Sequence, residues 1–119
     1  MKVALLGATD QKDRYAYKAF KKLTQAGHLV YLIHPKRTSI DHYPVFQSLA
    51  NLPEKPHTVT LYVSPEISTS LREAILQSGA QRVVFNPGTE NPVLENALEK
   101  AGIHAVRDCT LRMLDAGRF

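Results

Sequence analysis

The fold class follows from the stretch KVALLGAT, residues 2–9. Its apolar run at 2–6 is uninterrupted and ends at Gly7, which is typical of a strand buried on both faces of a parallel sheet. A helical period follows from about Tyr15, with apolar residues spaced along one face. Gly27 stands where a left-handed C-terminal cap is expected. This order of strand, polar loop and helix predicts an α/β fold.

The same unit recurs along the chain, so we expect a doubly wound, Rossmann-like parallel sheet of about five strands in the order 3-2-1-4-5. One domain over residues 1–119 accommodates it. The further strands are predicted at 28–33, 58–63, 82–85 and 103–106, with a short edge strand at 43–46 and one helical turn at 48–51. The further helices are predicted at 64–79, at 91–102 and, capped by Asp108, at 108–114.

Composition excludes several classes of protein. Hydrophobic residues make up 44% and charged residues 22% of the 119 residues, which excludes a disordered chain. No apolar run reaches membrane-spanning length, no signal-peptide layout is present, and one cysteine excludes an internal disulfide framework, so we expect a cytoplasmic protein. Residues 1–60 carry nine Lys and Arg against four Asp and Glu, yet no basic-aromatic pattern predicts nucleic-acid binding.

The end of the second predicted strand carries His34-Pro35-Lys36-Arg37. In nucleotide-binding parallel sheets this position meets the ribose next to the adenine, and an acidic residue there binds a free ribose diol. A lysine and an arginine favour a phosphate on that sugar instead. The candidate residues at this junction are Pro35, Lys36 and Arg37.

The loop after the first strand is a candidate phosphate-binding loop. It lacks the second and third glycines of the dinucleotide-binding motif. However, the hydroxyl of Thr9, the backbone amides at a helix start and the cations Lys12 and Arg14 suit a diphosphate, whereas a plain structural turn is the alternative. The candidate residues are Gly7, Ala8, Thr9, Asp10, Gln11, Lys12 and Arg14.

Several motifs together resemble the small single-domain CoA-binding protein family, itself similar to the N-terminal domain of the succinyl-CoA synthetase alpha subunit. They run in the family's order over nearly the whole chain. The motifs are Gly7-Ala8-Thr9, His34-Pro35-Lys36, Pro44-Val45-Phe46, Tyr62-Val63-Ser64-Pro65, Asn86-Pro87-Gly88 and Asp108-Cys109.

The resemblance implies a site for CoA or acyl-CoA made from three loops. Thr9 to Lys12 would bind the pyrophosphate, and Lys36 or Arg37 the adenosine phosphate. Val63, Ser64 and Pro65 would form the side of the site that contacts the adenine or the start of the pantetheine. The synthetase places a glycine between its proline and lysine, whereas Lys36 follows Pro35 directly here. Which cation makes the contact therefore stays open, and we favour Lys36.

These observations favour a non-catalytic CoA or acyl-CoA binding module. The alternatives are an NADP-binding Rossmann protein, such as a redox sensor or a reductase fragment, and an interaction subunit with a vestigial pocket. A homodimer or a partner enzyme is compatible with so short a chain. The synthetase's phosphorylated histidine belongs to a second domain, so its ligase activity is not carried over.

The remaining reactive residues are weaker candidates. The five histidines lack tight metal-ligand spacing. Glu90 and Asp108 suit helix starts better than acid–base catalysis. Cys109 is expected to be a small buried residue, and a mixed disulfide with the CoA thiol is the alternative.

Overall fold

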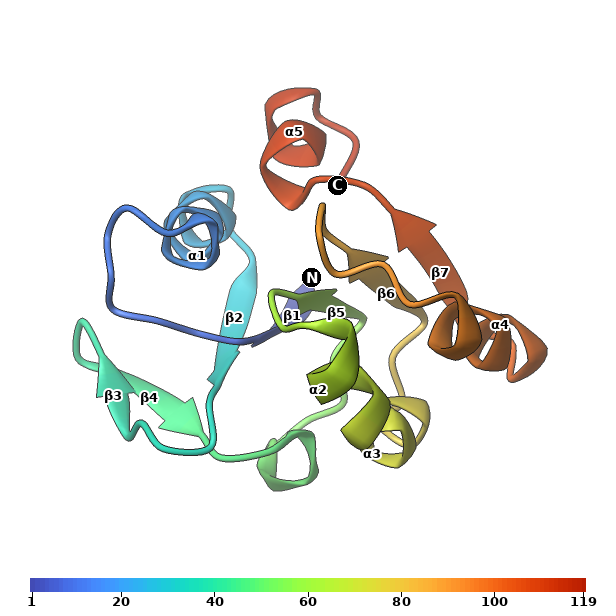
Figure 1. Cartoon of the computed structure of the whole chain (residues 1–119). Helices are drawn as coiled ribbons and strands as arrows, with labels where there is room; N and C mark the ends of the chain where they lie inside the picture. The colour runs from blue at the N-terminus through green and yellow to red at the C-terminus, as the bar shows by residue number, and fades with distance from the viewer.

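The computed structural model describes residues 1–119 and contains one seven-stranded sheet (Figure 1). The strand order is β3-β4-β2-β1-β5-β6-β7, and every pairing is parallel except that between β3 and β4. The strands are β1 (Lys2–Leu6), β2 (Leu29–Ile33), β3 (Ser39–Ile40), β4 (Tyr43–Phe46), β5 (Thr58–Leu61), β6 (Arg82–Phe85) and β7 (His104–Arg107).

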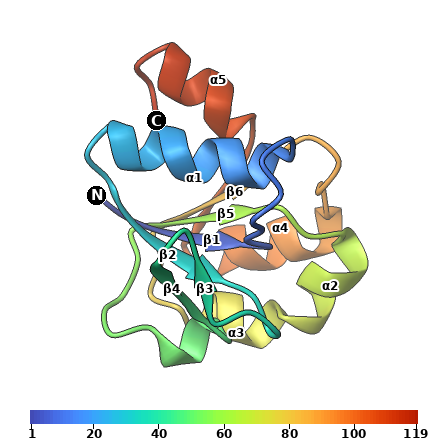
Figure 2. The same ribbon diagram turned by 90° about the vertical axis from the view of Figure 1, so that its left-hand side faces the viewer.

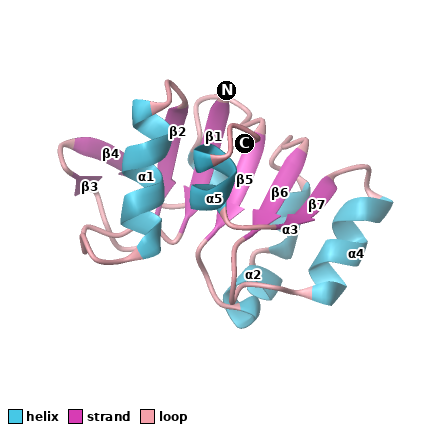
Figure 3. Ribbon diagram, turned by 90° about the horizontal axis from the view of Figure 1, so that it is seen from above, coloured by secondary structure: helices cyan, strands magenta, loops and turns pink.

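Helices cover both faces of the sheet. They are α1 (Tyr15–Gln25), α2 (Pro65–Ser70), α3 (Arg72–Leu76), α4 (Pro92–Lys100) and α5 (Thr110–Asp115), with a 3-10 turn at Leu49–Asn51. Figures 2 and 3 show α1 and α5 on one face, and α3 and α4 on the other.

The predicted Rossmann-like α/β fold is confirmed, but the sheet is larger than expected. Counting β4 as the third strand, β4-β2-β1-β5-β6 reproduces the predicted order 3-2-1-4-5. β7, the strand predicted at 103–106, continues this order at one edge, and β3 adds an unpredicted antiparallel strand at the other. The count of about five was therefore too low.

The uninterrupted apolar run of β1 serves two cores at once. Val3 and Leu5 pack with α1 on one face, whereas Ala4 and Leu6 join the core under α3 and α4 on the other. All four side chains are buried. Alternate residues of a strand point to opposite faces, so a strand covered on both sides needs no polar residue.

The helix predicted at 64–79 is in fact two short helices that meet at Leu71. Serine hydroxyls explain the break. Ser68 donates to the carbonyl of Pro65, and Ser70 donates to that of Ile67. Such bonds compete with the regular helical pattern. The side-chain amide of Asn91, at the start of α4, also donates to Ser68 Oγ in α2.

The predicted cap of the last helix is also wrong. α5 begins after Cys109, which makes no side-chain capping bond. Its first amide, that of Thr110, donates instead to Asn86 Oδ1 at the end of β6 (2.9 Å). Asp108 accepts from the Cys109 amide and forms an ion pair with Arg118.

The β3–β4 hairpin turns on two residues with left-handed backbone. Asp41 has φ of 50° and His42 has φ of 67°, as a tight two-residue hairpin requires. The Asp41 carboxylate accepts from Tyr17 Oη (2.5 Å) and pairs with Lys21 Nζ (2.9 Å), both on α1. These contacts hold the hairpin against α1.

Candidate functional site

A pocket of about 620 Å³ opens at the carboxyl edge of the sheet. The loops that follow β1, β2 and β5 meet there, because these three strands are neighbours in the centre of the sheet. The chain passes from β1 to β2 on one side of β1 and later continues with β5 on its other side. Open α/β sheets bind ligands at such switch points. Nine of the predicted site residues line this pocket: Gly7, Ala8, Thr9, Gln11, Arg14, Pro35, Arg37, Val63 and Ser64.

Gly7 fixes how closely the first loop passes the next strand. Its φ is +92°, and a Cβ there would lie 2.4 Å from the carbonyl oxygen of Tyr62. The amides of Gly7 and Ala8 both donate to the carbonyl of Ile33. Only glycine tolerates both a left-handed backbone and so close a contact with the Tyr62 carbonyl. Gly7 therefore lets the first loop pass close to the residue that follows β5.

Four predicted residues do not line the pocket: Asp10, Lys12, Lys36 and Pro65. Lys36 is exposed, and its backbone amide donates to His34 Nδ1 (3.0 Å). The next residue, Arg37, lines the pocket. Pro65 instead starts α2 behind Ser64, whose hydroxyl caps that helix.

Arg37 supplies positive charge to the pocket, and its guanidinium is only partly engaged. Its Nη1 lies 3.2 Å from Asp10 Oδ2. Its Nε is buried and has no hydrogen-bond partner. A buried N–H without a partner is costly, so the contacts of this guanidinium are incomplete.

The start of α1 adds a second anion-attracting element. Arg14 is the N-cap and lines the pocket, but its side chain does not cap the helix. The first turn contains no acidic residue. The partial positive charge of this eleven-residue helix is therefore not offset by a carboxylate in its first turn.

The opposite wall of the pocket was not predicted. Ile67, Ser70, Leu71 and Ala74 of α2 and α3 face it, and Ile67 is 48% exposed. The helical spacing of Ile67, Leu71 and Ala74 is visible in the sequence, but spacing alone does not tell whether such a face meets a core or a pocket. The pocket residues that sequence reasoning did not propose are Leu6, Ile33, His34, Gln47, Ser48, Leu49, Tyr62, Ile67, Ser70, Leu71 and Ala74.

Two titratable groups in the lining are shifted toward their neutral forms. Burial, followed by the charges of Arg37 and Lys36, lowers the pKa of His34. A neutral His34 can accept the Lys36 amide at Nδ1. Burial strongly raises the pKa of Tyr62, whose hydroxyl is buried without a hydrogen-bond partner.

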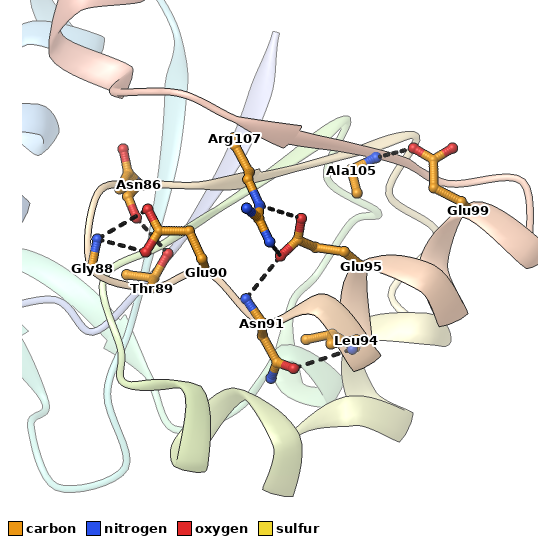
Figure 4. Close-up of polar contacts among 10 residues, drawn as sticks. All are labelled: Asn86, Gly88, Thr89, Glu90, Asn91, Leu94, Glu95, Glu99, Ala105 and Arg107. Atoms are coloured by element: carbon orange, nitrogen blue, oxygen red, sulfur yellow. Dashed lines mark hydrogen bonds and ion pairs between the residues drawn. The ribbon is translucent and has the colours of Figure 1, made fainter.

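The two candidate acid–base carboxylates both have structural partners. Figure 4 shows Glu90 turned back on its own loop, where its oxygens accept from the Gly88 amide at 3.0 and 3.2 Å. In the same view Glu95 accepts from Arg107 and from the Asn91 amide. Asp108 is held by Arg118. Neither Glu90 nor Asp108 lines the 620 Å³ pocket.

The remaining candidates lie away from this pocket. Cys109 is a free, partly exposed cysteine outside the lining, rather than fully buried as expected.

No group of three or more His, Cys, Asp or Glu side chains is arranged to hold a metal ion. None of the five helices is long and apolar enough to cross a bilayer.

The sheet, its switch-point pocket and the glycine-poor first loop define the chain as a Rossmann-like α/β domain. More specifically, the chain belongs to the CoA binding domain family, whose sequence model matches residues 1–115. The predicted family is therefore confirmed.

Solved structures share this fold. An uncharacterized protein is 39% identical with a TM-score of 0.87, over 99% of this chain and 97% of that one. A hypothetical protein from Pyrococcus horikoshii OT3 is 28% identical with a TM-score of 0.91, over 96% and 81%. A dinucleotide-forming acetyl-coenzyme A synthetase from Ca. Korarchaeum cryptofilum shares the fold at 16% identity and a TM-score of 0.75, over 90% and 25%.

Proposed function

We propose that this protein is a non-catalytic binding module for CoA or acyl-CoA in the cytoplasm. The observation that carries the proposal is the position of Arg37. Its half-satisfied guanidinium lies in the same pocket as the first loop, the start of α1 and an apolar wall. Membership of the CoA binding domain family supports this choice of ligand.

The pocket has a positively charged side, which suits the phosphates of CoA, and an apolar side, which suits its adenine and pantetheine. The adenosine phosphate would lie at Arg37, because a guanidinium binds phosphate oxygens in pairs. The pyrophosphate would lie at the first loop, near Arg14 and the amides that open α1. Val63, Ile67 and Leu71 would contact the adenine or the pantetheine.

Thermal unfolding with CoA, dephospho-CoA, NADP and NAD tests this assignment. A ligand that binds only the folded state stabilises it by about 2.7 kcal/mol at a hundred times its Kd. We expect CoA to raise Tm most and dephospho-CoA to raise it less. A response to NADP without one to CoA would instead support the NADP-binding alternative, because the NADP ribose phosphate also suits Arg37. No response to any of the four would support an interaction subunit.

Two neighbouring cations provide a matched pair of variants. Arg37→Ala should weaken CoA binding roughly 10- to 100-fold, because a hydrogen-bonded charge contact is lost. Its preference for CoA over dephospho-CoA should disappear. Lys36→Ala should change binding far less, since Lys36 lies outside the lining. Isothermal titration calorimetry measures both, and the reverse ranking would place the phosphate at Lys36.

A further inference from the structure

Asp10 and Arg37 form an ion pair between two loops of the pocket. Asp10 belongs to the loop after β1, and Arg37 belongs to the loop after β2. Asp10 Oδ2 lies 3.2 Å from Arg37 Nη1. Asp10 itself does not line the pocket, so its carboxylate reaches Arg37 from outside the lining.

This pair leaves the guanidinium incompletely bound. The carboxylate contacts Nη1, whereas the buried Nε has no partner. The Asp10 side chain is 57% exposed, and the Arg37 side chain 32%. A pair this open to solvent is only weakly held. A phosphate carries more charge and more acceptor oxygens, so it can compete with the carboxylate for the guanidinium.

We infer that Asp10 is a specificity-determining residue, which neutralises Arg37 in the empty pocket and gives way to a phosphorylated ribose. The inference rests on the proposed function, because it assumes that the ligand phosphate lies at Arg37. A ribose without the 3′-phosphate offers nothing at Arg37 that displaces the carboxylate. Arg37 then stays with Asp10 and contributes nothing to the binding of such a ligand.

Removing the charge of Asp10 should therefore affect only ligands that carry the ribose 3′-phosphate. Asp10→Asn abolishes the competition for Arg37. Adenosine 3′,5′-bisphosphate and CoA should bind roughly 2- to 5-fold more tightly, which is the range that an exposed ion pair contributes. AMP and dephospho-CoA should bind as they do to the wild type.

Isothermal titration calorimetry of the full chain at constant ionic strength tests this with all four ligands. Asp13→Asn is the matched control, because Asp13 lies in the same loop and forms no ion pair. It should leave the ratio of CoA to dephospho-CoA affinity unchanged. In the Arg37→Ala background, Asp10→Asn should give no gain.

Three results would overturn the inference. Equal tightening of ligands with and without the 3′-phosphate would show a general charge effect. Weaker AMP binding by Asp10→Asn would show that Asp10 holds a ribose hydroxyl. A gain that persists without Arg37 would show that the pair is irrelevant. Binding of the bisphosphate but not of CoA would contradict the proposed function while still testing Asp10, whereas binding of neither overturns both.

Discussion

Gly7, at the end of the first strand, is required to be glycine for two separate reasons. Its backbone is left-handed, and a side chain would meet the Tyr62 carbonyl. Gly102 also has a positive φ, of +81°, but no atom lies within 4 Å of a Cβ built there. Comparing substitutions at the two glycines therefore distinguishes the cost of backbone strain from the cost of steric overlap.

Gly7→Ala should lower the free energy of unfolding by about 3 kcal/mol, from left-handed strain plus overpacking. Gly102→Ala carries the strain alone and should cost about 1–2 kcal/mol. Urea denaturation followed by circular dichroism measures both. Equal losses would show that the first loop moves away from β5 at no cost.

His34 should make the protein less stable in mild acid. Its folded-state pKa is lowered, so the unfolded chain takes up the proton first. The stability that neutral His34 contributes is complete above about pH 6.5 and is lost as the pH falls through the folded-state pKa. Protonation also removes the acceptor of the Lys36 amide.

NMR titration should give His34 a pKa below its usual value, and Arg37→Ala should raise it. Burial lowers the pKa of His28 as well, so His34→Asn should remove only part of the loss of stability in acid. A His34 that titrates at or above its usual value would contradict this account.

At the scale of elements, Asn86 joins two strands and a helix. Its Nδ2 donates to Thr60 Oγ1 (2.7 Å) and to the Leu61 carbonyl (2.8 Å) at β5. Its Oδ1 accepts the first amide of α5, that of Thr110. The side chain is buried, so water cannot replace these partners at no cost.

Asn86→Ala should therefore destabilise the fold by about 3 kcal/mol, because it leaves buried polar groups unpaired. Hydrogen exchange should increase most in α5, whose first amide loses its acceptor. Asn51→Ala, in an exposed turn, is the control and should stay within about 0.5 kcal/mol. Unchanged exchange in α5 would show that packing alone holds this helix.

Elements governed by burial pattern were predictable, and those governed by individual side-chain bonds were not. The run that became β1 and the later parts of β2 and β6 are apolar because both faces of the sheet are covered there. The break at Leu71 instead depends on where the hydroxyls of Ser68 and Ser70 point. The hairpin of β3 and β4 turns without glycine, so its signal was absent from the sequence.

The candidate site divides in the same way. Its three loops were predicted because the carboxyl ends of neighbouring parallel strands share one edge of the sheet. The sequence did not tell which of Lys36 and Arg37 lines the pocket, since two adjacent cations at the end of a strand are equivalent in the pattern. The wall of α2 and α3 was missed because one apolar stripe can face a core or a pocket.

Across the whole molecule, the pocket draws on only part of the chain. Its lining runs from Leu6 to Ala74, whereas β6 and β7 come later in sequence. A chain emerging from the ribosome thus presents every lining residue before the sheet is complete. Until β6 arrives, one edge of β5 has no strand beside it, and the Leu61 carbonyl lacks Asn86. β6 therefore completes the sheet beside the pocket, although it supplies none of the residues that line it.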